Sequence, residues 1–97
     1  MEREFASIFI EQSEKQLSKL VEHIVDGQSE IWVETAHLLK GGAATIGAMQ
    51  MREQAAKAQE MFVATFAERE DIYASLEGAF TAVRDELVNQ QLYSLAA

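Results

Sequence analysis

The chain of 97 residues contains no cysteine and no proline, and it contains only five glycines. Without cysteine there is no disulfide framework, no thiolate zinc site and no cysteine nucleophile, so the fold must rest on packing alone. The scarcity of proline and glycine, together with abundant Ala, Glu, Gln, Leu and Met, favours helices throughout. We therefore predict an all-α protein.

Basic residues are also few, because 8 Lys and Arg stand against 16 Asp and Glu, for a formal charge of −8. This charge repels nucleic acid phosphates and anionic lipids, so it argues against both ligands and favours a protein partner. No apolar run approaches the roughly 20 residues that span a bilayer, and the chain begins MEREF rather than with a basic and then an apolar stretch. We expect a cytoplasmic protein without membrane contact.

The length fits one domain over residues 1–97 with a single modest core, since 48% of the residues are apolar, as in ordinary globular proteins. Apolar residues at helical spacing predict a first helix from Phe5 to Val25. A second helix is predicted to begin after a Ser29 cap and to end at Gly47. Its inward face is predicted to consist of Ile31, Thr35, Leu38, Gly42 and Ile46.

A third helix of roughly four turns is indicated by apolar residues that step by four, three and four positions: Met51, Ala55, Ala58 and Phe62. The polar run AERED, residues 67–71, breaks this pattern. A fourth helix follows, with an inner face of Ile72, Leu76, Ala79, Phe80, Val83 and Leu87. Connections this short place neighbouring helices antiparallel, so we predict an antiparallel up-down four-helix bundle. We expect a monomer, although the apolar residues Leu92, Tyr93 and Leu95 also suit an oligomer, a longer core or a frayed end.

The stretch TAHLLKGGAATIG places two adjacent glycines, Gly41 and Gly42, inside the predicted second helix. Each costs about 1 kcal/mol relative to alanine, so a helix needed only for stability would not contain them. At about 100° per residue, His37 lies roughly 160° from the predicted inner face and should therefore face solvent. The same outward sector holds Val33, Lys40, Gly41 and Ala44, with Glu34 at its border. Gly41 supports no core contact there, so its lack of a side chain indicates that access to the imidazole matters.

An exposed imidazole and an ammonium group one helical turn later are chemical groups that can accept and hold a phosphoryl group. One ring nitrogen of His37 attacks phosphorus, and Lys40 offsets charge on the phosphoryl oxygens. Glu34 is a candidate to accept a hydrogen bond from the other ring nitrogen and fix the tautomer, although a solvated glutamate is an equally good interpretation. The alternative is an ordinary surface histidine beside glycines that let helices approach closely.

The segment AHLLKGGAATIG resembles the signature of histidine phosphotransfer domains, in which a helical A-H-x-x-K-G is followed by small residues and by a glycine ten positions after the histidine. The matching residues are Ala36, His37, Lys40, Gly41 and Gly47. The resemblance implies an antiparallel four-helix bundle whose His37 carries a phosphoryl group to or from aspartates of response-regulator receiver domains. It also implies a receiver domain, a hybrid sensor kinase or both as partners, magnesium supplied by the receiver, and no cofactor of the chain's own.

For such a carrier we expect partner contacts around the histidine at Val33, Glu34, Ala44 and Gly47, with Ser18, Lys19 and Lys57 as candidates for the rim. The K-G-G form is also similar to the phospho-accepting domain of chemotaxis kinases, so a relay protein and a fragment of such a kinase both stay open. The chain has no G-x-G run and no Walker loop, so it is not expected to phosphorylate itself from ATP.

Two other classes of function compete with this interpretation. Glu34-x-x-His37 has the form of a carboxylate-bridged di-iron motif, but that site needs two such motifs and two further glutamates, all facing inward. The other histidine, His23, has Leu20 three residues before it and is interpreted as a boundary packing residue of the first helix, so no metal site is expected. A non-catalytic bundle that binds a response regulator or another partner without carrying phosphate is the main alternative.

Overall fold

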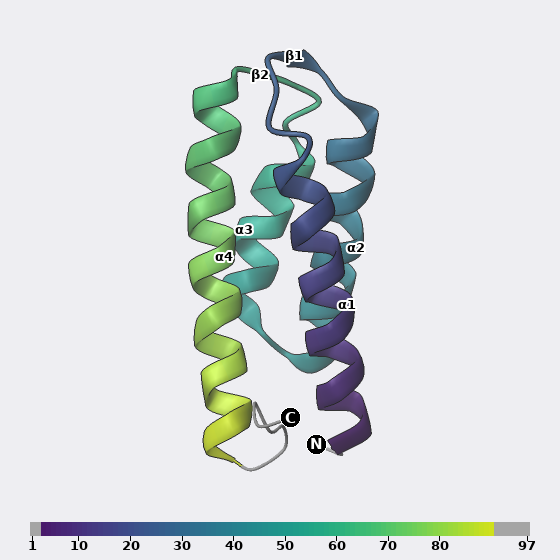
Figure 1. Cartoon of the computed structure of the whole chain (residues 1–97), viewed down its shortest axis with the longest axis vertical. Helices are drawn as coiled ribbons and strands as arrows, with labels where there is room; N and C mark the ends of the chain where they lie inside the picture. Colours follow the sequence, from purple (N-terminus) through teal and green to yellow (C-terminus); the bar gives the residue numbers. More distant parts are fainter. Residues whose placement is uncertain (1–2, 91–97) are drawn as a thin grey trace.

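The structure of the chain, a computed structural model, describes residues 3–90 and contains four helices in that range. They are α1 Arg3–Val21, α2 Glu30–Ile46, α3 Met49–Gln59 and α4 Phe66–Asn89. Consecutive helices run in opposite directions, so α1 begins at the same end of the bundle where α4 finishes (Figure 1). The predicted all-α antiparallel four-helix bundle is confirmed. The apolar residues Leu92, Tyr93 and Leu95 lie outside the described residues.

Both predicted ends of α2 are confirmed. The Ser29 side chain accepts a hydrogen bond from the backbone N–H of Trp32, which caps the start of the helix. Gly47 has a left-handed backbone with φ of 76°, a conformation that glycine adopts at low cost, and it ends the helix. Gly47 and Ala48 donate backbone hydrogen bonds to the carbonyls of Ala44 and Ala43, so the chain turns at once into α3.

The predicted inner face of α2 is confirmed at Thr35, which is buried, and at Ile46, which packs against the core, but it is wrong at Ile31 and Leu38. The buried residues are Trp32, Thr35, Ala36, Leu39 and Ala43, whereas Ile31 and Leu38 are 42% and 54% exposed. The indole of Trp32 is fully buried, and its Nε1–H donates to the carbonyl of Ala58 in α3 at 2.8 Å. Because a buried indole needs an acceptor, this bond favours the observed rotation of α2.

Three predicted boundaries also differ from the structure. The first helix ends at Val21 rather than Val25, and α3 ends at Gln59, so Phe62 lies in the following connection. The run AERED does not interrupt the helices, because α4 already begins at Phe66. Thr65 and Glu68 form a capping box that starts the helix there, and the run occupies its first turns. The predicted inner face of α4 is confirmed, with Leu76, Phe80 and Leu87 buried and Ile72, Ala79 and Val83 partly buried against the core.

The two connections at one end of the bundle pair with each other. Strands β1 Gly27–Gln28 and β2 Val63–Ala64 form a short antiparallel ladder (Figure 1). Arg69 of α4 lies beneath this ladder, fully buried, with its guanidinium 5.5 Å from the centre of the Trp32 ring. Its N–H groups donate to the carbonyls of Val25, Gly27, Met61, Phe62 and Ala64. One side chain from the run predicted to be a break therefore ties both connections to the core.

Candidate functional site

His37 lies in the middle of α2, and its predicted solvent exposure is confirmed. Lys40, one turn further along, is half-buried, while Gly41 and Ala44 are exposed. The side-chain amide of Gln59, the last residue of α3, lies with Nε2 at 3.1 Å from Nδ1 of His37. In this contact the amide N–H donates to Nδ1, so the imidazole is held at that ring nitrogen.

The residue that contacts the imidazole differs from the predicted candidate, Glu34. Glu34 is exposed, and within residues 3–90 its carboxylate makes no hydrogen bond or ion pair with another side chain. Gln59 contacts the ring instead from a neighbouring helix, half-buried and through its donor nitrogen, while its buried Oε1 has no hydrogen-bond partner among residues 3–90. Spacing along α2 could not reveal this contact, because it depends on how α3 packs against α2.

The two adjacent glycines have different surroundings. A Cβ atom at Gly41 would meet no atom of the rest of the structure within 4 Å, so this position is open beside the histidine. At Gly42 a Cβ atom would lie 3.9 Å from Cδ1 of Phe9, so this glycine faces α1. Within the described residues, no neighbouring group packs against the space at Gly41. This space is therefore open to a group that approaches the imidazole of His37.

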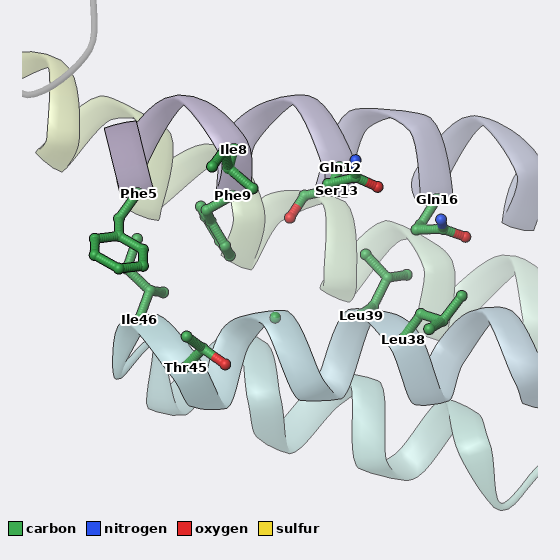
Figure 2. Close-up of a pocket in the computed structure, with 11 residues that line it drawn as sticks. Phe5, Ile8, Phe9, Gln12, Ser13, Gln16, Leu38, Leu39, Thr45 and Ile46 are labelled. Carbon is green, nitrogen blue, oxygen red and sulfur yellow. The ribbon is translucent and has the colours of Figure 1, made fainter. Parts of the chain in front are cut away.

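An apolar groove runs between α1 and α2, on the side of α2 to which Leu38 points (Figure 2). Its volume is about 500 Å³, and its most exposed apolar walls are Phe5, Ile8 and Leu38. The other lining residues are Phe9, Gln12, Ser13, Gln16, Leu39, Gly42, Thr45 and Ile46. Leu38 follows His37 directly in the chain, so the two side chains lie about 100° apart around α2, with Leu38 in the groove and His37 outside its lining. Sequence reasoning missed the groove because Leu38 was assigned to the core.

The chain was compared with models of protein families, and the result agrees with a helical bundle that carries an exposed, hydrogen-bonded histidine on its second helix. The model described as Hpt domain matches residues 4–92. The chain belongs to the Hpt domain family. Neither the curated proteins nor the solved structures provide a match. Hpt domains take part in phosphotransfer in two-component signalling and interact with response-regulator receivers, so this Hpt domain belongs to a phosphorelay.

Not all residues predicted to contact a partner lie near His37 in this Hpt domain. Val33 was expected to face outward, but it is half-buried and packs against the core. Gly47 ends α2 ten residues after the histidine, roughly 15 Å along the helix axis. The predicted rim residues are all exposed: Ser18, Lys19 and Lys57. Nζ of Lys57 lies 3.9 Å from Oε1 of Glu53 within α3. The other two predicted contact residues are exposed, with Glu34 about one turn before His37 and Ala44 about two turns after it.

The competing di-iron arrangement is not formed in this Hpt domain. It requires Glu34 and His37 to face the bundle interior, and both are exposed. His23 lies just beyond α1, half-buried, with Nδ1 at 2.8 Å from the carbonyl oxygen of Lys19. Among the described residues, no three His, Asp or Glu side chains converge as metal ligands would.

No helix within residues 3–90 is both long enough and apolar enough to cross a membrane.

Proposed function

We propose that this Hpt domain carries a phosphoryl group on Nε2 of His37 and exchanges it with an aspartate of a receiver domain. The observation that carries the proposal is the pairing of an exposed imidazole with the Gln59 amide, 3.1 Å from Nδ1. A ring held at one nitrogen and open at the other is an oriented nucleophile rather than a freely rotating surface histidine.

The accepting step needs a lone pair on Nε2 and a proton on Nδ1. The Gln59 amide meets this need when it turns so that Oε1 accepts a hydrogen bond from Nδ1–H. Nε2 then attacks the phosphorus of an aspartyl phosphate: the N–P bond forms, the O–P bond breaks, and the aspartate carboxylate leaves with the electron pair. The Nδ1 proton stays on the ring, and the amide oxygen stabilises the positive charge that develops there. The donating step is the reverse.

Two neighbours of His37 take part in this proposal. Lys40, half-buried one turn away, offsets negative charge on the phosphoryl oxygens with its ammonium group. Gly41 leaves room for the phosphoryl group and for the receiver's active site. The receiver supplies the acceptor aspartate and the magnesium ion, so this chain contributes the nucleophile and a docking surface.

The groove between α1 and α2 provides the apolar part of that docking surface, with Leu38 at its edge and Phe5 and Ile8 on the opposite wall. Exposed apolar side chains of this size beside a reactive group mark a contact for another protein. Leu38→Ala should therefore weaken receiver binding while the fold is kept, because this side chain is 54% exposed. Met49→Ala is the matched control, since Met49 is 63% exposed and lines a different pocket.

The direct test incubates the protein with a phosphorylated, magnesium-loaded receiver domain and separately with a small phosphoryl donor. Intact mass and phosphorus NMR are then recorded for the wild type and for His37→Ala, with circular dichroism to confirm that both are folded. An acid-labile, base-stable phosphoryl group on the wild type alone is the expected result. If several donors leave the folded wild type unlabelled, the bundle that binds a partner without carrying phosphate becomes the better description.

A further inference from the structure

Exposed apolar side chains also gather at the end of the bundle where the two connections pair, away from the groove. Val25, Phe62, Val63 and Phe66 are 41%, 40%, 66% and 46% exposed, and we refer to these four residues as the end patch. In Figure 1 they belong to the β1–β2 end, opposite the end where α4 finishes. None of the four contributes to the groove or to the His37 site.

The backbone beneath the end patch is held together by buried polar contacts. The guanidinium of Arg69 donates hydrogen bonds to the backbone carbonyls of both Val25 and Phe62, so one buried side chain holds the backbone at these two residues. Asp26 accepts a hydrogen bond from the backbone N–H of Phe66 at 2.6 Å, which places Phe66 next to the connection that carries Val25. The backbone segments that carry the four side chains are therefore held together before binding, which lowers the ordering cost of binding.

The charge around the end patch is predominantly negative, and the exposed basic residues nearby are Lys19 and Lys57 in the last turns of α1 and α3. Residues 21–31 and 60–71 contain a single Lys or Arg, the fully buried Arg69. The exposed acidic residues in these two ranges are Glu22, Asp26, Glu30, Glu60, Glu68, Glu70 and Asp71. An apolar surface with an acidic rim attracts a basic surface and repels an acidic one, including a second copy of this chain with its formal charge of −8.

We propose that the end patch binds a second protein partner, through a helix that presents an aliphatic stripe flanked by lysine or arginine residues. The aliphatic stripe covers the end patch, and the basic flanks face the acidic rim. His37 lies eight residues into the chain from Ser29, roughly 12 Å along α2 from that end. The Hpt domain can then be held by one protein at its end while the histidine exchanges phosphate with another on its flank.

The test uses a fluorescein-labelled 18-residue peptide of leucine and lysine with leucine at helical spacing, and a matched peptide with glutamate in place of lysine. Fluorescence anisotropy measures affinity for the full chain, and amide NMR shifts locate the bound peptide. The lysine peptide should shift the amides of Val25, Gln28, Val63 and Phe66, and the glutamate peptide should not bind. Val63→Ser should weaken binding by about fivefold or more, since it removes the most exposed apolar side chain of the end patch.

Two controls keep this test specific. Val63 is 66% exposed, so Val63→Ser should keep the wild-type circular dichroism and melting temperature. Ile8→Ser removes an apolar side chain of similar exposure, 57%, from the α1–α2 groove and should leave peptide affinity unchanged. The proposal is overturned by shifts that map to the groove, by equal binding of the glutamate peptide, or by a dimer in sedimentation that Val63→Ser dissociates. These readouts involve no phosphate, so they are independent of the function proposed for His37.

Discussion

Gln59 of α3 holds His37 of α2 across the interface between the two helices, with Nε2 of the amide 3.1 Å from Nδ1 of the ring. The two residues are 22 positions apart, so the contact depends on the turn at Gly47 and Ala48 that sends α3 back along α2. The backbone bonds from Gly47 to Ala44 and from Ala48 to Ala43 close that turn in the manner of a Schellman motif. The signature glycine ten residues after the histidine thus contributes to the site by placing α3.

Gln59→Ala should keep the fold and slow phosphorylation of His37 by about three- to tenfold, because one hydrogen bond that orients the ring is lost. Gln59→Glu should restore most of the rate, since a carboxylate oxygen also accepts from Nδ1–H. Stopped-flow phosphorylation and nitrogen NMR of the imidazole tautomer measure the two effects. Gln50→Ala, an exposed glutamine on the same helix, is the matched control. An unchanged rate and tautomer in Gln59→Ala would remove Gln59 from the mechanism.

Gly41→Ala should raise stability by about 1 kcal/mol and slow phosphotransfer. The gain is expected because Gly41 is helical and exposed and a Cβ there meets nothing within 4 Å. Gly78→Ala is a close control, since Gly78 is also exposed, lies within α4 and has open space around it. Thermal unfolding should show similar gains for both variants, with slower transfer for Gly41→Ala alone. Equal transfer rates in the two variants would show that the bare surface at Gly41 has no role in access.

The features that sequence reasoning predicts well are the local ones. The Ser29 cap and the Gly47 end of α2 follow from side-chain and backbone chemistry within a few residues, and both are present. His37 is exposed despite the error in the predicted inner face, because at 100° per residue it also lies roughly 145° from the centre of the face that is observed to be buried.

The features that depend on packing between helices were not predictable. Ile31 and Leu38 form a second apolar stripe on α2 beside the one that contains Trp32 and Leu39, and spacing alone cannot say which stripe is buried. The acceptor that Trp32 finds at Ala58 helps to decide this. Leu38 of the exposed stripe then lines the groove.

Glu68→Gln should lower stability at neutral pH by a margin that shrinks as the solution becomes acidic. The backbone N–H of Thr65, followed by its hydroxyl, holds the pKa of the Glu68 carboxyl below the ordinary value of 4.5. The charged form is favoured in the folded state, so its contribution is complete above pH 4.5 and is lost as the pH falls through the lowered pKa. Thermal unfolding of both proteins from pH 7 downward measures the difference. Parallel stability curves would show that the carboxylate charge contributes nothing to the capping box.

Arg69→Met should destabilise the fold by about 3 kcal/mol or more, because buried carbonyls in both connections lose their donor. Arg69→Lys should recover only part of this loss, since an ammonium group cannot reproduce the planar fork that reaches several carbonyls at once. Urea unfolding followed by the fluorescence of Trp32, the one tryptophan in the sequence, reports on this region directly. Arg84→Met is the control: its guanidinium pairs with Asp85 at 3.8 Å near the surface, and its loss should cost at most about 1 kcal/mol. If both variants cost the same small amount, Arg69 does not hold the β1–β2 end together.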